Sequence, residues 1–125
     1  MTRLELDAES LGLMVQTFYA AVRQDSELGP VFQQALGDDW SAHLERLTHF
    51  WSTMVLGTRT FQGNVYGTHM RLAGIAPIHF ERWLALFDAT ALGLFTPAAA
   101  ATLMQSAHRV AGSLQLGYFD KVVVA

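Results

Sequence analysis

The stretch that decides the fold runs from Phe61 to Trp83, FQGNVYGTHMRLAGIAPIHFERW, and joins two long amphipathic segments. It has no long apolar period before Pro77. In compact domains, connections of more than roughly 12–15 residues without secondary structure are uncommon, and most are functional or disordered. Its large apolar side chains are Phe61, Val65, Tyr66, Met70, Leu72 and Ile75. Because such side chains favour burial over disorder, we expect a packed, functional connector.

His69 lies in the middle of this connector, directly after Gly67 and Thr68, so its backbone is not held in a long helix. A histidine on a packed connector between two apolar helices suits an axial ligand that reaches into a cavity. The alternative is a buried, hydrogen-bonded histidine without a ligand, which is the commoner situation for a single histidine. The other helices must decide between the two interpretations.

The composition predicts one domain, residues 1–125, with a core over about 10–117 and short flexible tails. Hydrophobic residues make up 51% of the chain and charged residues 15%, too apolar for a disordered protein. The mean hydropathy of +0.23 is high for a small domain. An apolar cavity that holds a large apolar ligand explains this excess, and so does a self-associating surface.

Several classes are disfavoured by charge and residue usage. The net charge of −3 without a basic run gives no indication of nucleic-acid binding. Without cysteine there is no disulfide, iron–sulfur cluster or thiolate zinc site. Residues 89–107 are uncharged over about the length of a membrane span, but Thr96-Pro97 indicates a helix start inside them. We expect two buried helices there, and the N-terminus has no signal-peptide pattern, so the predicted location is cytoplasmic.

The spacing of apolar residues predicts an all-α fold of four helices, without strands or repeats. They run over Ser10–Gln24, from Trp40 to about Leu56, from Pro77 to about Leu94, and from Pro97 to about Gly117. Leu28-Gly29-Pro30 is interpreted as the stop after the first helix, and Gly57 as the stop after the second. Thr96 is the predicted cap of the last helix. No helix is predicted at Val31-Phe32 or in the tail from Tyr118.

Three predicted helices each place one hydrogen-bonding side chain on an apolar face: Tyr19, His43 and Trp83. Taken singly, Tyr19 is better explained as a tyrosine at the edge of the core and Trp83 as a core tryptophan bonded to a nearby carbonyl, while His43 faces inward or lies along a rim. Together with His69 they form the general pattern of a cofactor site, an apolar pocket with a few convergent polar groups. Without cysteine, carboxylate clusters or a glycine-rich phosphate loop, haem fits a single histidine ligand best.

A conventional metal site is not expected on the second helix. His43 shares its face with Leu47, Phe50 and Met54, which follow at spacings of four, three and four residues. His49 lies six positions after His43, about 240° away around the helix, so the two cannot chelate one ion. No HExxH pair occurs in the chain.

Five segments, in order, resemble the truncated haemoglobins, specifically group III. They are FYAAVR with Tyr19, LGPVF with Phe32, DWSAHLERLTHFW with His43, FQGNVYGTH with His69 and HFERWLALF with Trp83. The resemblance extends from Leu11 to about Gly117, and the ordered set is specific although no single segment is. The glycine pairs of groups I and II are not evident, in agreement with group III.

This resemblance implies a shortened globin fold, with helix pairs packed two over two around haem b (iron protoporphyrin IX). It also implies that His69 is the proximal metal ligand and that Tyr19, His43 and Trp83 stabilise a ligand on the distal side. The expected cofactor-binding set is His69, Phe32, Leu47, Phe50, Met54, Phe80 and Trp83.

Two details of the resemblance stay open. Val65 stands where family members often carry proline, and with Gly67 nearby the proximal segment is expected to be looser than in relatives. Arg46, Arg59 and Arg71 are candidates for the haem propionates, although a solvated surface position is the alternative for each. The sequence does not rank them.

The implied function is binding of a diatomic ligand (oxygen, nitric oxide or carbon monoxide) at a pentacoordinate haem iron. Three donors around one ligand favour oxygen and nitric-oxide redox chemistry over bulk oxygen delivery. Nitric-oxide dioxygenase, nitrite reductase and peroxidase-like activities remain open, as does a reductase partner. The alternative is a haem-free globin-fold domain that acts as an interaction or sensor module. A monomer or weak dimer without nucleic-acid or membrane partners is expected.

Overall fold

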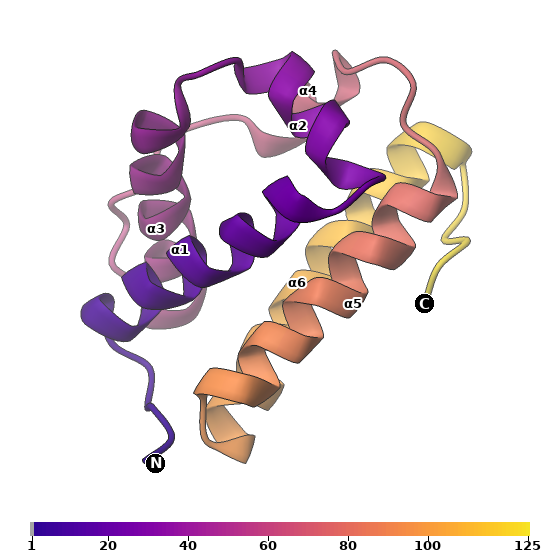
Figure 1. Ribbon diagram of the computed structural model, residues 1–125. Helices are drawn as coiled ribbons and strands as arrows, with labels where there is room; N and C mark the ends of the chain where they lie inside the picture. The colour runs from indigo at the N-terminus through magenta and orange to yellow at the C-terminus, as the bar shows by residue number, and fades with distance from the viewer. Residues whose placement is uncertain (1) are drawn as a thin grey trace.

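The computed structural model describes residues 2–125, which form six helices (Figure 1). They are α1 (Ala8–Gln24), α2 (Leu28–Leu36), α3 (Trp40–Leu56), α4 (Val65–Met70), α5 (Pro77–Leu94) and α6 (Pro97–Phe119). Within this range the only β-type contact is an isolated bridge between Leu4 and Phe95. The predicted all-α class is therefore confirmed.

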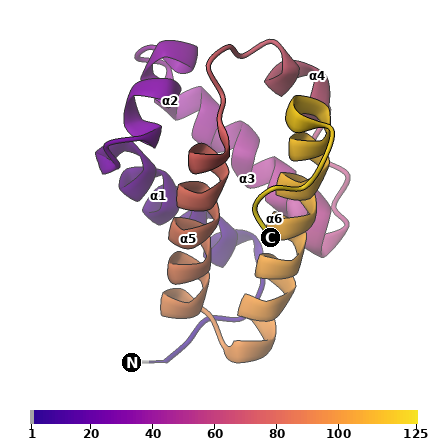
Figure 2. The same ribbon diagram turned by 90° about the vertical axis from the view of Figure 1, so that its right-hand side faces the viewer.

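The long helices form two packed pairs. α5 and α6 run antiparallel side by side, and α1 crosses α5 while it packs on α3 (Figures 1 and 2). Aromatic rings fill the space between the pairs: the ring centroids of Phe18 and Phe87 are 5.2 Å apart, and those of Trp51 and Phe87 are 5.0 Å apart. All three side chains are almost fully buried. This arrangement is the two-over-two sandwich that the sequence predicts.

Most helix ends follow the sequence signals. Asp7 caps α1 by accepting the Ser10 amide at 2.7 Å. Thr96 caps α6, and Pro97 occupies its first position, as predicted. Gly57 ends α3 at a φ of +70°, where a side chain would be strained. α6 continues to Phe119, slightly beyond the predicted end at Gly117.

The helix α2 is absent from the sequence prediction, in which Leu28-Gly29-Pro30 is a stop. Proline is tolerated in the first turn of a helix because the backbone amides of that turn have no acceptor inside the helix. Asp25 supplies the missing acceptor: one carboxylate oxygen accepts the amides of Glu27 and Leu28 at 3.0 and 2.9 Å. The proline therefore lies inside α2 and does not end the preceding helix.

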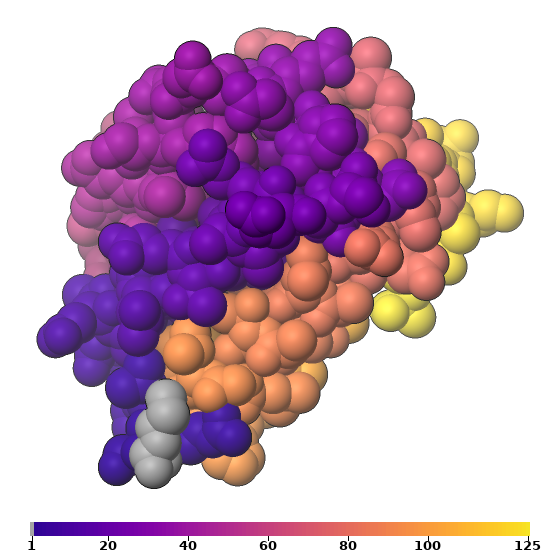
Figure 3. Space-filling model, in the orientation of Figure 1, coloured from indigo at the N-terminus to yellow at the C-terminus, as the bar shows by residue number. Residues whose placement is uncertain are grey.

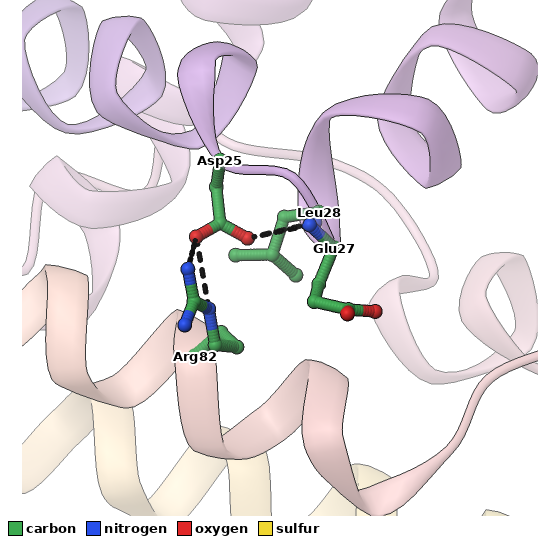
Figure 4. A network of polar contacts seen from close by, with 4 residues as sticks. All are labelled: Asp25, Glu27, Leu28 and Arg82. Carbon is green, nitrogen blue, oxygen red and sulfur yellow. Dashed lines mark hydrogen bonds and ion pairs between the residues drawn. The ribbon is translucent and has the colours of Figure 1, made fainter.

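The other carboxylate oxygen of Asp25 binds Arg82 of α5, whose Nε donates at 2.9 Å and whose Nη2 forms an ion pair (Figure 4). The Arg82 guanidinium, helped by the two backbone amides and opposed by burial, holds the pKa of this carboxyl below its usual value. One carboxylate thus joins the α1–α2 turn to α5. Figure 3 shows α1 and α2, in indigo to purple, lying beside the orange surface of α5.

The connector between α3 and α5 contains the short helix α4, which the sequence does not reveal. The side chain of Asn64 accepts the Gly67 amide at 2.9 Å and so caps it. The connector is otherwise irregular, as predicted.

A search of residues 2–125 finds no helix that combines the length and apolar character needed to cross a membrane. The uncharged segment is interrupted between Leu94 and Pro97, where α5 ends and α6 begins.

Candidate cofactor pocket

A cavity of about 290 Å³ lies among α1 to α6, with walls that are mostly apolar. This is near the lower end of the roughly 300–1,000 Å³ typical of small-molecule sites. Eight of the predicted site residues line it: Tyr19, Phe32, His43, Leu47, Phe50, His69, Phe80 and Trp83. The fold therefore brings side chains from five separate helices to one space.

Met54, the ninth residue of the predicted set, does not line this cavity. Its side chain is 41% exposed. Met54 has the same angular position on α3 as His43, but it lies about 16 Å further along the helix axis. The apolar stripe thus continues past the end of the pocket, and helical periodicity does not show where along the axis a cavity stops.

His69, in the last turn of α4, lines the cavity with a half-buried side chain. Its Nδ1 lies 2.7 Å from the carbonyl oxygen of Val65, one helical turn earlier. A carbonyl can only accept, so Nδ1 carries a proton, and in the neutral ring the lone pair is then on Nε2. This is the state in which histidine binds metal ions, with the second nitrogen held by a backbone oxygen.

Tyr19 is 4% exposed and faces the cavity from α1. Burial raises the pKa of its hydroxyl, and a smaller contribution from the Trp83 side chain acts in the opposite direction. The phenol therefore keeps its proton at neutral pH and can donate a hydrogen bond into the cavity. The ring is held by edge contacts with Phe18 and Phe32, at centroid distances of 4.7 and 5.8 Å.

His43 faces the same space from α3, with a centroid 5.9 Å from that of Tyr19. Its Nε2 is buried and has no hydrogen-bond partner within residues 2–125. Burial lowers the pKa of His43, and the neighbouring charge of Arg46 acts in the same direction, so the ring is neutral at pH 7. A buried polar atom without a partner is costly, which indicates that something else occupies this position.

Trp83 of α5 is fixed by stacking on Phe87 and by an edge contact with Phe18, each at a centroid distance of 5.4 Å. Its side chain is half-buried because one side of the indole lines the cavity. Tyr19, His43 and Trp83, each on a different long helix, are thus brought together.

Several residues that shape the cavity are missing from the sequence prediction. Trp40 packs against Tyr19 and His43, at centroid distances of 6.4 and 6.1 Å, and its indole Nε1 is buried without a partner among the described residues. Its place at the first position of α3 gives no sequence signal of this. Further lining residues come from α2: Leu28, Val31, Ala35 and Leu36.

Of the three arginines that the sequence does not rank, Arg46 lines the cavity. Arg59 and Arg71 do not. Arg46 is exposed, one turn after His43 on α3, so a guanidinium lies where the cavity meets the surface. Within residues 2–125, no group of three or more histidine or carboxylate side chains is placed to hold a metal ion.

Comparisons with known proteins agree with this geometry. No family model matches the chain. The chain is 29% identical over 113 residues to the group 3 truncated hemoglobin ctb of Campylobacter jejuni, which covers 88% of this chain and 89% of that protein. The crystal structure of group III truncated hemoglobin from Campylobacter jejuni matches with a TM-score of 0.90 and 28% identity, over 94% of this chain and 96% of that one.

The fold is thus that of a truncated globin, a two-over-two helical sandwich. The similarity at the level of both sequence and structure is to the group III truncated haemoglobins, which confirms the resemblance found in the sequence.

Proposed function

We propose that this protein binds haem b in the cavity, with His69 as the axial ligand of the iron. The observation that carries this proposal is the bond from His69 Nδ1 to the Val65 carbonyl, which leaves Nε2 as the nitrogen free to bind a metal in an apolar pocket. The name of the similar Campylobacter jejuni protein, a truncated hemoglobin, supports the same choice.

The residues present fit this cofactor. The walls are apolar and aromatic, as the porphyrin faces require, while Arg46 lies at the surface end, where a propionate would emerge. The unpartnered Nε2 of His43 is accounted for if a ligand occupies the space in front of it.

When bound, haem supplies an iron atom that takes up a diatomic ligand such as oxygen, nitric oxide or carbon monoxide. The chain supplies the surroundings. Tyr19 and Trp83 line the cavity and would donate hydrogen bonds to a polar ligand in it, and they are rigid because their rings pack in the core. His43 is neutral and only half-buried, which suits a gate at the pocket rim.

This arrangement favours tight retention of a polar ligand, and hence oxygen and nitric-oxide redox chemistry over bulk delivery. Aligning a donor that is already oriented costs little free energy, so nearly all of the free energy of its hydrogen bond stabilises the bound ligand. The cytoplasmic location, the reductase and the monomeric or weakly dimeric state stay predictions.

The test is an absorption spectrum of purified protein after haem is supplied. A strong Soret band that shifts on addition of dithionite and then carbon monoxide is expected. Its absence would favour the haem-free interaction or sensor module. That alternative requires the polar groups to be bonded to backbone, whereas the buried His43 Nε2 has no hydrogen-bond partner within residues 2–125.

A further inference from the structure

The helix α4, which carries His69, is short and has few buried side chains to hold it in place. It has six residues, well below the roughly 12–15 at which isolated helices are already marginal, and none of its side chains is fully buried. Within the described chain, the helix on which it packs is α6 (Figure 2). The position of His69 therefore depends on what α6 provides.

Gly117 of α6 gives α4 room to approach. A Cβ atom at this position would lie 2.6 Å from the hydroxyl oxygen of Tyr66 and 2.7 Å from the sulfur of Met70. Atoms do not pack that closely, so any larger residue would displace these side chains. Both side chains belong to α4, and the glycine consequently leaves the space that they occupy against α6.

Tyr118, the next residue, donates its hydroxyl proton to the backbone carbonyl of His69. The same carbonyl accepts the Leu72 amide at 2.9 Å, so both of its lone pairs are used. The Tyr118 ring packs against Phe80 of α5, at a centroid distance of 6.0 Å.

Two hydrogen bonds, one inside α4 and one between α4 and α6, thus orient the His69 imidazole. Inside α4, His69 Nδ1 is tied to the Val65 carbonyl at 2.7 Å. Between helices, the His69 carbonyl is tied to Tyr118. We propose that Gly117 and Tyr118 are positioning residues that hold His69 in register with the cavity, an inference that rests on the proposed role of His69 as axial ligand.

The experiment compares Tyr118→Phe with Tyr66→Phe. Both variants remove one hydroxyl from the α4–α6 contact, but the Tyr66 hydroxyl has no hydrogen-bond partner in the described chain and its side chain is half exposed. The first readout is hydrogen exchange of residues 65–72 with and without haem. Loss of one neutral hydrogen bond should speed exchange by roughly two- to tenfold in Tyr118→Phe and leave Tyr66→Phe unchanged.

The second readout is the iron–histidine stretching band of the ferrous, haem-loaded protein in resonance Raman spectra. Tyr118→Phe should shift or broaden this band, and so should Gly117→Ala, whereas Tyr66→Phe should not. A band identical in all the proteins would overturn the positioning role even if exchange were faster, because Tyr118 would then only stabilise α4. If the wild type took up no haem, the proposed function would fail, and unchanged exchange in Tyr118→Phe would separately refute the contact.

Discussion

The cavity has two sides that are built in different ways. One is the aromatic wall, consisting of Tyr19, His43 and Trp83, which stand on helices of 17, 17 and 18 residues. The other is the α4 wall, which presents His69 from a helix of six residues. The helices of the aromatic wall share a buried core, whereas α4 has no fully buried residue.

Because of this difference, substitutions on the aromatic wall should change the hydrogen-bond donors of the cavity, whereas substitutions on the α4 wall should change where His69 lies. Side chains on the aromatic wall are held by many packing contacts, so removing one hydroxyl or indole N–H changes a donor and leaves the wall where it is. The α4 wall depends on a few directional bonds: those of Asn64, Val65 and Tyr118. We therefore expect substitutions on the two walls to differ in kind as well as in size.

The largest effect is expected when the α4 wall loses its imidazole. His69→Ala should abolish stable haem binding or make it dependent on added imidazole, because it removes the proposed axial ligand of the iron from the cavity. Haem retention and the Soret band measure this. His49→Ala is the matched control, since His49 is exposed and bonds only Thr60. A normal haem spectrum in His69→Ala without exogenous ligand would refute the assignment.

Removal of haem should affect the α4 wall more than the aromatic wall. A cofactor that binds only the folded state contributes about 4 kcal/mol at a free concentration 1,000 times its dissociation constant. For a domain of this size, this corresponds to a difference of about 10–20 °C in melting temperature. Hydrogen exchange should accelerate first in residues 65–72 and last in α1. Equal melting temperatures with and without haem would count against haem as part of the core.

Single donors on the aromatic wall should control how fast ligands leave. A hydrogen bond to a ligand that carries partial negative charge contributes about 1.5–3 kcal/mol. Tyr19→Phe and Trp83→Phe should therefore raise oxygen dissociation by roughly ten- to a hundredfold. Carbon monoxide, which is less polar when bound, serves as the control ligand and should respond less.

Stopped-flow measurement of both gases, with His43→Ala as a third variant, separates donor from gate. A gate should alter entry and exit of the two gases alike. If neither Tyr19→Phe nor Trp83→Phe raises the oxygen rate more than the carbon monoxide rate, the donor assignment is wrong.

The smallest effect concerns Asp25, which supports the aromatic wall from outside the cavity. Its folded-state pKa is lowered, chiefly by Arg82, so its contribution to stability is present above the unfolded value of about 3.9 and is lost as the pH falls through the folded value. Asp25→Asn should lower the melting temperature at pH 7. Below about pH 4, the melting temperature of this variant should fall less with decreasing pH than that of the wild type. Glu27→Gln, an exposed neighbour, is the control. Parallel acid profiles for Asp25→Asn and wild type would contradict this.

The long helices could be predicted because burial imposes a period on the sequence. The bounds of α5, Pro77–Leu94, agree with the prediction at both ends. The helix α2 also carries this period, which the interpretation of Gly29-Pro30 as a stop obscures. Its apolar residues recur at helical spacing: Leu28, Val31, Phe32, Ala35 and Leu36.

The site is harder to predict than the fold. Helix faces are enough to indicate that Tyr19, His43 and Trp83 point inward, but the axial limits of the pocket, and thus the exclusion of Met54, depend on how helices cross. The hydrogen bond from the Tyr118 hydroxyl to the His69 carbonyl joins residues 49 positions apart in the chain. No spacing rule covers such a contact, because it arises from tertiary packing.

The carboxylate of Asp25 also has a consequence for the variation that selection can tolerate. The Asp25 carboxylate accepts hydrogen bonds from three groups, two backbone amides and a guanidinium, and its side chain is 3% exposed. Within residues 2–125 the Arg82 guanidinium bonds Asp25, and its side chain is 45% exposed. A buried carboxylate that lost this guanidinium would be left without its main charge partner. Among descendants of this sequence, position 82 should therefore stay basic for as long as position 25 stays acidic, although the exposed partner is the easier of the two to exchange for another cation.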